Sequence, residues 1–146
     1  MKYFYLLGAS IYSFLTYGQS DYILSNLDSS KDDYAKIAMQ IWEYAEMGYQ
    51  EKKSSALLQN KLKESGFLVK AGVAGIPTAF VAEYNNGGPI IAILGEYDAL
   101  PGLSQKALPY KVTNEGRGGH ACGHHLFGTA SAAAAIAAAA AAAAAA

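Results

Sequence analysis

The sequence predicts an α/β protein with a central mixed sheet flanked by helices. Two helical segments come first, and three strand-forming stretches follow them. The last stretch, residues 89–94, is an almost continuous apolar run, which is typical of a strand buried on both faces of a sheet. Side chains able to bind metals come after it, where open α/β sheets bind their ligands.

The first helix is expected from apolar residues that recur three and four positions apart, a period that lets a helix bury one face. These residues are Tyr34, Ile37, Ala38, Ile41, Trp42 and Ala45. The Asp-Ser-Ser sequence at 28–30 offers oxygens that cap a helix N-terminus, and Gly48 is expected to end the helix. The period favours a buried face over an aromatic ligand site.

A second helix is expected to begin at Ser54 or Ser55, either of which is able to cap it. Leu58 and Leu62 lie on one face of this helix. Gly66 is expected to end it, because glycine readily adopts the left-handed backbone found just after a helix.

Strands are expected over residues 67–69, 78–84 and 89–94. The Asn-Asn-Gly-Gly sequence at 85–88 predicts a hairpin between the last two strands. Residues 101–119 then form a long connection without clear periodicity. Such a loop is either functional or a surface excursion, and both interpretations stay open.

Residues 119–125, Gly-His-Ala-Cys-Gly-His-His, contain the only cysteine and all three histidines of the chain. Thiolate and imidazole bind ions such as zinc, so Cys122 and His124 are candidate ligands, with His120 and His125 beside them. The alternative to a metal site is a set of ordinary polar loop histidines and one small buried cysteine. No second Cys-x-x-Cys or His pair follows, so a metal site here would be open, as catalytic sites are.

Glu96 and Asp98 follow the third predicted strand and add two carboxylates to this region. A glycosidase pair is a competing interpretation. Two carboxylates so close along one strand end do not readily flank a sugar at the separation of about 5 to 9.5 Å that glycosidases need.

The composition of the chain argues against nucleic-acid binding and excludes an internal disulfide. The 146 residues are 52% hydrophobic, enough for one modest domain, and the net charge of −1 comes without any basic run. Nucleic acid is therefore not an expected partner, because binding phosphates needs clustered Lys and Arg. A single cysteine excludes an internal disulfide.

The two ends of the chain differ from its middle. Residues 1–18 combine a basic start with a short apolar core and read as a signal peptide, so a periplasmic or secreted protein is expected. A buried first helix or strand is the alternative. Residues 19–131 form the expected domain. Residues 132–146 are alanine apart from Ile136; they indicate a truncated chain, a gene-model artefact or a low-complexity tail, and no membrane span is expected.

Three motifs resemble the amidohydrolase branch of the aminoacylase/carboxypeptidase metallopeptidase family. They are Ile-Leu-Gly-Glu-Tyr-Asp-Ala-Leu-Pro-Gly-Leu-Ser-Gln at 93–105, Gly-His-Ala-Cys-Gly-His at 119–124 and Gly-Thr-Ala at 128–130. Members include hippurate, indole-acetyl-amino-acid and p-aminobenzoyl-glutamate hydrolases, and the last group is the most similar. The resemblance covers about residues 34–136 and includes Glu51.

The resemblance implies the N-terminal part of a zinc-peptidase-like catalytic domain that holds two divalent ions of zinc, manganese or cobalt. Cys122 would be the ligand shared between the ions, His124 would bind one, and Asp98 would orient the site. Glu96 is not a reliable ligand in this branch, and His120 would shape the loop. The inserted dimerisation domain of the family is missing, and the full-length protein is expected to be a homodimer.

Two departures from the family pattern stand out. His125 occupies a position where relatives usually have Asp or Asn. The catalytic glutamate of the family comes downstream of residues 119–125, the metal loop, in a region where this chain has only alanine and Ile136. The expected function is metal-dependent hydrolysis of N-acyl or N-aroyl amino acids or small dipeptides, with this 146-residue chain inactive by itself. The alternative is a non-catalytic fragment that binds metal or a partner.

Overall fold

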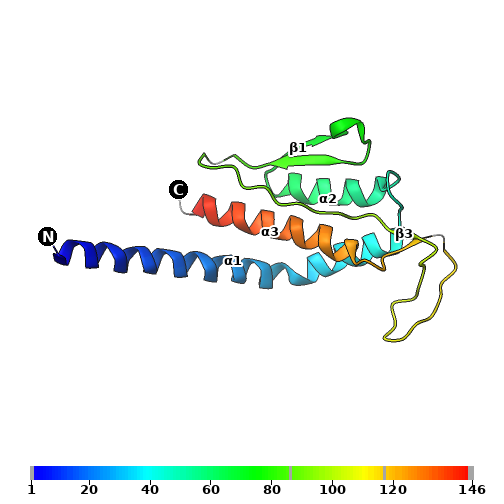
Figure 1. Cartoon of the computed structure of the whole chain (residues 1–146), viewed down its shortest axis with the longest axis horizontal. Coiled ribbons are helices and arrows are strands. Elements are labelled where there is room, and N and C mark those ends of the chain that lie inside the picture. Colours follow the sequence, from blue (N-terminus) through cyan, green and yellow to red (C-terminus); the bar gives the residue numbers. More distant parts are fainter. Residues whose placement is uncertain (1, 86, 117, 145–146) are drawn as a thin grey trace.

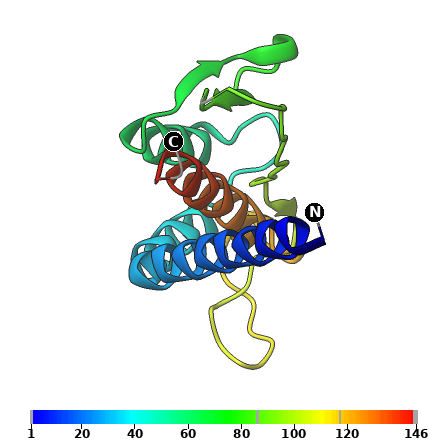
Figure 2. The same cartoon turned by 90° about the vertical axis from the view of Figure 1, so that its left-hand side faces the viewer.

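The computed structural model describes residues 2–85, 87–116 and 118–144, and for residues 2–19 only the backbone. Helices and two small sheets combine in it, which agrees with an α/β composition. The elements, in chain order, are α1 (Lys2–Tyr44), α2 (Lys52–Glu64), β1 (Leu68–Ala71), the 3-10 turn η1 (Val73–Gly75), β2 (Phe80–Glu83), β3 (Leu100–Pro101), β4 (Gly118–Gly119) and α3 (His124–Ala144). Helix α3 lies between α1 and α2, and the antiparallel β1–β2 hairpin lies beyond α2 (Figures 1 and 2).

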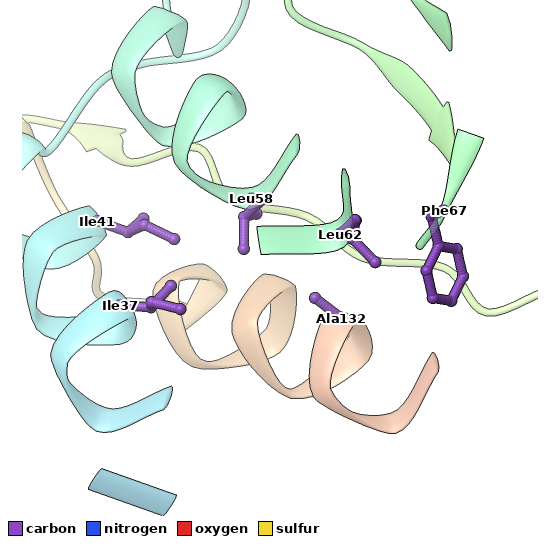
Figure 3. Close-up of a cluster of buried hydrophobic side chains, with 6 residues drawn as sticks. All are labelled: Ile37, Ile41, Leu58, Leu62, Phe67 and Ala132. Carbon is purple, nitrogen blue, oxygen red and sulfur yellow. The ribbon is translucent and has the colours of Figure 1, made fainter. Parts of the chain in front are cut away.

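The core forms where the three helices meet. Figure 3 shows its buried side chains, which come from α1, α2, α3 and the turn that follows α2: Ile37, Ile41, Leu58, Leu62, Ala132 and Phe67. The predicted apolar face of α1 is therefore confirmed at Ile37, Ala38 and Ile41. Burial of such side chains stabilises a fold by about 25 cal/mol per Å² of apolar surface.

Alanines of α3 complete this core. Ala132, Ala133, Ala137 and Ala141 are buried, and their spacing places them along one side of the helix. Small side chains let helix axes approach closely, which explains how α3 fits between its two neighbours. Among the described helices, α3 is also long and apolar enough to cross a membrane, although a third of it is buried here and soluble core helices share these properties. The expected absence of a membrane span stays a prediction.

The predicted start of the first helix is wrong. Asp28, Ser29 and Ser30 lie inside α1, which runs through them without a break. The Ser29 hydroxyl donates a hydrogen bond to the carbonyl of Asn26, so it bonds within the helix instead of capping it. The helix also ends at Tyr44 rather than Gly48. Residues 2–18 of the predicted signal peptide are helical, Met1 lies outside the described residues, and export stays a prediction.

The predicted cap of the second helix is also wrong. Glu51 is the N-cap residue of α2 but makes no side-chain cap bond, and Ser54 and Ser55 lie within the first turn. The cap comes from Glu46, whose carboxylate accepts hydrogen bonds from the backbone N–H groups of Lys53 at 3.0 Å and Ser54 at 2.9 Å. It also accepts the Ser54 hydroxyl at 2.9 Å. A carboxylate suits this place, because a helix N-terminus carries partial positive charge.

Glu46→Gln is expected to lower the free energy of unfolding by about 1 kcal/mol, because a neutral amide replaces a charged acceptor at the end of α2. Urea denaturation followed by circular dichroism measures this loss. Glu43→Gln, on the last turn of α1, is the matched control and should leave stability almost unchanged. Equal stability of the Glu46 variant and the parent chain would contradict the cap.

The end of α2 is as predicted. Gly66 has a φ of 88°, in the left-handed region. Its N–H bonds to the carbonyl of Lys63, and the N–H of Phe67 bonds to the carbonyl of Leu62. This is the Schellman arrangement, and it turns Phe67 into the core beside Leu62.

The predicted central strand is absent among the described residues. Residues 89–94 form no strand, and Ile90 and Ile91 are 97% and 83% exposed. A strand buried on both faces needs neighbouring strands on its edges, and the described chain places none beside it. The 85–88 turn likewise does not close a hairpin, although Asn85 bonds the N–H of Gly87; Asn86 lies outside the described residues.

The hairpin that does form joins β1 and β2, pairing Leu68 with Glu83. Farther along the chain, β3 pairs with β4, and Gln105 bridges to Thr113 between them. The two ends of the predicted connection at 101–119 therefore lie together at the β3–β4 pair. The loop between them projects away from the helices (Figure 1). Arg117, within it, lies outside the described residues.

Candidate metal centre

Three predicted site residues, Glu96, Asp98 and His124, meet at the start of α3. The Nδ1 atom of His124 lies 2.7 Å from Oδ1 of Asp98, and its Nε2 atom lies 3.0 Å from Oε2 of Glu96. Among the described residues these three form the group whose ligand atoms all lie within 4.8 Å of one another. The side chain of His124 is 21% exposed and that of Glu96 is 49% exposed, so the group opens to solvent.

The chain turns sharply just before His124, which is the first residue of α3. Gly123 has a φ of 77°, a backbone conformation that glycine adopts without a steric cost. Its N–H bonds to the carbonyl of His120, and its own carbonyl accepts the N–H of Phe127 in the first turn of the helix. The turn therefore directs His124 out of the loop at the helix N-terminus.

Small residues of α3 bring the carboxylates to His124. A Cβ atom on Gly128 would lie 2.7 Å from the backbone oxygen of Glu96, so only glycine lets the two backbones come this close. Three residues later the hydroxyl of Ser131 donates a 2.6 Å hydrogen bond to the carbonyl of Leu94. Segment 94–98 is thereby held against the same helix that begins with His124.

Tyr97 anchors this segment on its other side. Its ring stacks on Phe80 with centroids 6.0 Å apart, and its hydroxyl donates to the carbonyl of Thr78 at 2.5 Å. Burial raises the pKa of Tyr97; the nearby charge of Glu51 adds to this rise, and a hydrogen bond with Ser55 opposes it. The phenol therefore stays protonated and able to donate at neutral pH.

His120 and His125 form a separate pair with ring centroids 5.0 Å apart. His120 donates from Nε2 to the carbonyl of Ile41 at 3.0 Å, because a carbonyl oxygen only accepts. Burial lowers the pKa of both histidines, so neutral imidazole is favoured. The Nδ1 atoms of both rings are buried and have no hydrogen-bond partner among the described residues. His120 thus joins residues 119–125 to α1, and its predicted role in shaping that loop stays a prediction.

Cys122 lies outside the group of three. It is a free, exposed cysteine, although it was predicted as the ligand shared between two ions. The structure therefore brings together Glu96, Asp98 and His124 but leaves Cys122 apart from them. Its predicted role rests on the resemblance alone and stays a prediction.

The three grouped residues suit a divalent ion by the chemistry of their donor atoms. Imidazole and carboxylate are ligands of zinc and manganese, and such ligands bind zinc at about 2.0 to 2.2 Å. Two donor atoms at that distance from one tetrahedral ion lie about 3.4 Å apart, so the 3.0 Å between His124 Nε2 and Glu96 Oε2 would widen slightly when an ion binds between them. Asp98 at Nδ1 then orients the ring, as carboxylates commonly do for histidine ligands.

Sequence reasoning missed two groups of residues that build this site. Gly128 and Ser131 receive the carboxylate-bearing segment, and Glu46 caps α2 from across a loop. A glycine inside a helical stretch, followed three residues later by serine, indicates close packing and was the available clue. The contact of Glu46 left no local clue, since it joins residues on different elements.

Comparison with known proteins identifies several relatives over a limited region. The chain is 46% identical to a subunit of p-aminobenzoyl-glutamate hydrolase from Escherichia coli over 108 residues, which are 72% of this chain and 22% of that protein. It is 35% identical to hippurate hydrolase of Campylobacter jejuni over 92 residues, 63% of this chain and 24% of the relative. It is 30% identical to N-acetyl-L-cysteine deacetylase of Bacillus subtilis over 101 residues, 68% of this chain and 24% of the relative.

These matches share one feature, which is that each covers only part of the relative. The chain spans 22% to 24% of the length of these three curated proteins. No family model matches the chain.

Proposed function

Because this chain belongs to the amidohydrolase and aminoacylase family, we propose that its protein hydrolyses the amide bond of N-acyl or N-aroyl amino acids or of small peptides, using divalent metal ions. The observation that carries this proposal is the convergence of Glu96, Asp98 and His124 in a chain that is similar to hydrolases and a deacetylase. The family predicted from the sequence motifs is confirmed by these relatives.

Each grouped side chain has a role in this proposal. A bound divalent ion would polarise the amide carbonyl and make its own water more acidic. His124 would hold the ion through Nε2, while Asp98 keeps the proton on Nδ1 and fixes the ring. Glu96 supplies a further oxygen beside Nε2. Cys122 is proposed as an additional ligand, on the strength of the resemblance.

The proton transfers of hydrolysis need a further group. By resemblance, a glutamate after the metal loop would take the proton from water and deliver it to the leaving amine. This chain has alanine in that region, so we expect the 146-residue chain alone to be inactive. The E. coli relative is named as one subunit of its enzyme, and assembly of the full-length protein as a homodimer or with another chain belongs to the same proposal.

The test uses the complete gene product, loaded with Zn²⁺ or Mn²⁺. It is incubated with p-aminobenzoyl-glutamate, N-benzoylglycine and N-acetyl amino acids, and amine release is measured. Turnover of at least one substrate is expected, with loss of activity in His124→Ala. Asp33→Asn, an exposed position on α1, is the control and should keep full activity. Folded, metal-loaded protein without turnover on any substrate would favour the non-catalytic metal-binding alternative.

We also propose that residues 1–18 direct export, on the basis of their basic start and short apolar core. The mature protein would then begin at Gln19 and lie in the periplasm or outside the cell. N-terminal sequencing of protein recovered from its native host decides this, and an intact Met1 on cytoplasmic material would overturn it.

A further inference from the structure

Glu51 is a buried acidic residue that the proposed chemistry does not use. It is only 7% exposed, and among the described residues no Lys, Arg or His forms an ion pair with it. Burying a carboxylate is costly unless hydrogen bonds compensate for the lost water. The compensation here includes the hydroxyl of Thr78, which donates to Oε2 of Glu51 at 2.7 Å.

Thr78 links Glu51 to the segment that carries the metal centre. Its hydroxyl bonds Glu51, and its carbonyl accepts two hydrogen bonds, from the Ser55 hydroxyl at 2.6 Å and from the Tyr97 hydroxyl at 2.5 Å. The side chain of Gln59 in turn donates to the Ser55 hydroxyl at 2.9 Å. The five residues join α2 with the residue before it, the turn before β2 and segment 94–98 in one polar network.

Tyr97 is the member of this network that reaches the metal centre. It lies between Glu96 and Asp98 in the chain, and both of those carboxylates contact His124. The phenol of Tyr97 points instead toward α2 and the turn before β2, where it bonds Thr78. Movement of Tyr97 would therefore move both carboxylates relative to the imidazole.

The surroundings of Gly48 also place Glu51 near the same segment. A Cβ atom on Gly48 would lie 3.9 Å from Oδ2 of Asp98 and 4.0 Å from Oε1 of Glu51, so both carboxylates face this glycine. The loop between α1 and α2 also holds the next residue, because the N–H of Ala99 donates to the carbonyl of Glu46 at 2.7 Å. Segment 96–99 thus touches the surroundings of Glu51 at two points.

From these contacts we propose that Glu51 is a positioning residue for the metal centre, acting through Thr78 and Tyr97 on Glu96 and Asp98. The inference rests on the proposed function, because it takes the grouped residues to be a metal site. Glu51 itself contacts neither the imidazole nor an ion. It keeps the carboxylate of Glu96 beside Nε2 of His124 and the carboxylate of Asp98 on Nδ1.

The experiment titrates the 146-residue chain with Co²⁺, whose visible absorption reports ligand geometry and whose affinity calorimetry measures. Tyr97→Phe and Glu51→Gln remove one donor and one charge with little change in shape. Each is expected to weaken Co²⁺ binding about tenfold and to alter the absorption spectrum, as loss of partners behind metal ligands typically does. Thr78→Val should behave in the same way, and Thr78→Ser, which keeps the hydroxyl, should bind as the parent chain does.

Tyr84→Phe is the matched control, because Tyr84 lies just after β2 and its ring packs on Phe67, away from the network. It should leave Co²⁺ affinity and spectrum unchanged. Thermal unfolding of every variant separates the two possible roles: a purely structural network lowers the midpoint but leaves the affinity of folded protein intact. If Tyr97→Phe proves unfolded, the nearly isosteric Glu51→Gln decides.

The outcomes distinguish this inference from the proposed function. A parent chain that binds Co²⁺, with folded Tyr97→Phe and Glu51→Gln variants that bind it equally well, would overturn the positioning role alone. A parent chain that binds no Co²⁺ would reject the metal centre and the positioning role together. Weakened binding in both variants with rescue in Thr78→Ser supports the inference.

Discussion

His124→Ala should lower the affinity of the chain for Zn²⁺ or Co²⁺ more than about 100-fold, a larger loss than removal of a residue behind a ligand produces. The imidazole lies between the two carboxylates, 2.7 Å from Asp98 and 3.0 Å from Glu96. Without it, two like charges face each other with no nitrogen donor between them. Calorimetric titration of the purified chain measures the affinity.

Elemental analysis after dialysis adds a comparison with Cys122→Ala. If Cys122 is a ligand, as the resemblance implies, this variant should also lose metal. If the exposed position of the thiol persists in the metal-bound protein, metal content should stay unchanged. Asp33→Asn, exposed on α1, serves as the control. His124→Ala with the same metal affinity as the parent chain would refute the site.

Gly128→Ala should destabilise the chain and weaken metal binding, although alanine is the better helix former. Helix propensity alone would stabilise the variant by about 0.5 to 1 kcal/mol. The new Cβ would lie 2.7 Å from the backbone oxygen of Glu96 and 3.2 Å from Cβ of Tyr97, and a backbone oxygen has no rotamer by which to move away. Overpacking of this kind costs about 1 to 3 kcal/mol, so a net loss of stability is expected.

The displaced group in that variant is the backbone of Glu96, so the carboxylate should move away from His124 and Co²⁺ affinity should fall. Urea denaturation and Co²⁺ titration measure the two effects. Ala130→Gly, at an exposed position of the same helix, is the control. It should lose up to about 1 kcal/mol through helix propensity while metal affinity stays constant. A Gly128 variant that is more stable and binds metal normally would contradict the close approach.

The local predictions that succeeded depend on neighbours in the chain. Gly66 ends α2 in the left-handed conformation, because both hydrogen bonds of that turn join residues within α2 or next to it. The apolar face at Ile37 and Ile41 is buried as its period predicts. Periodicity and turn chemistry are properties of short segments, so a single sequence contains them.

The predictions that failed depend on what lies opposite a segment. The side chains of Asp28, Ser29 and Ser30 cap a helix only if the helix begins there, and α1 continues through them with Ser29 bonded internally. Residues 89–94 have the composition of a central strand, but a strand needs partners, and none lies beside them among the described residues. An apolar composition predicts that a segment prefers to be buried, but it does not predict whether a neighbouring strand is present to pair with it.

The sequence by itself determined the family, the buried face of α1 at Ile37 and Ile41, the glycine that ends α2, and the grouping of histidines and carboxylates in two short segments. Only the tertiary structure decided which of these side chains meet. The bond from His124 to Asp98 joins residues 26 positions apart, and the anchor from Tyr97 to Thr78 joins residues 19 apart. Such contacts exist because α3 packs against segment 94–98 through Gly128 and Ser131, and no local pattern encodes the meeting of two surfaces.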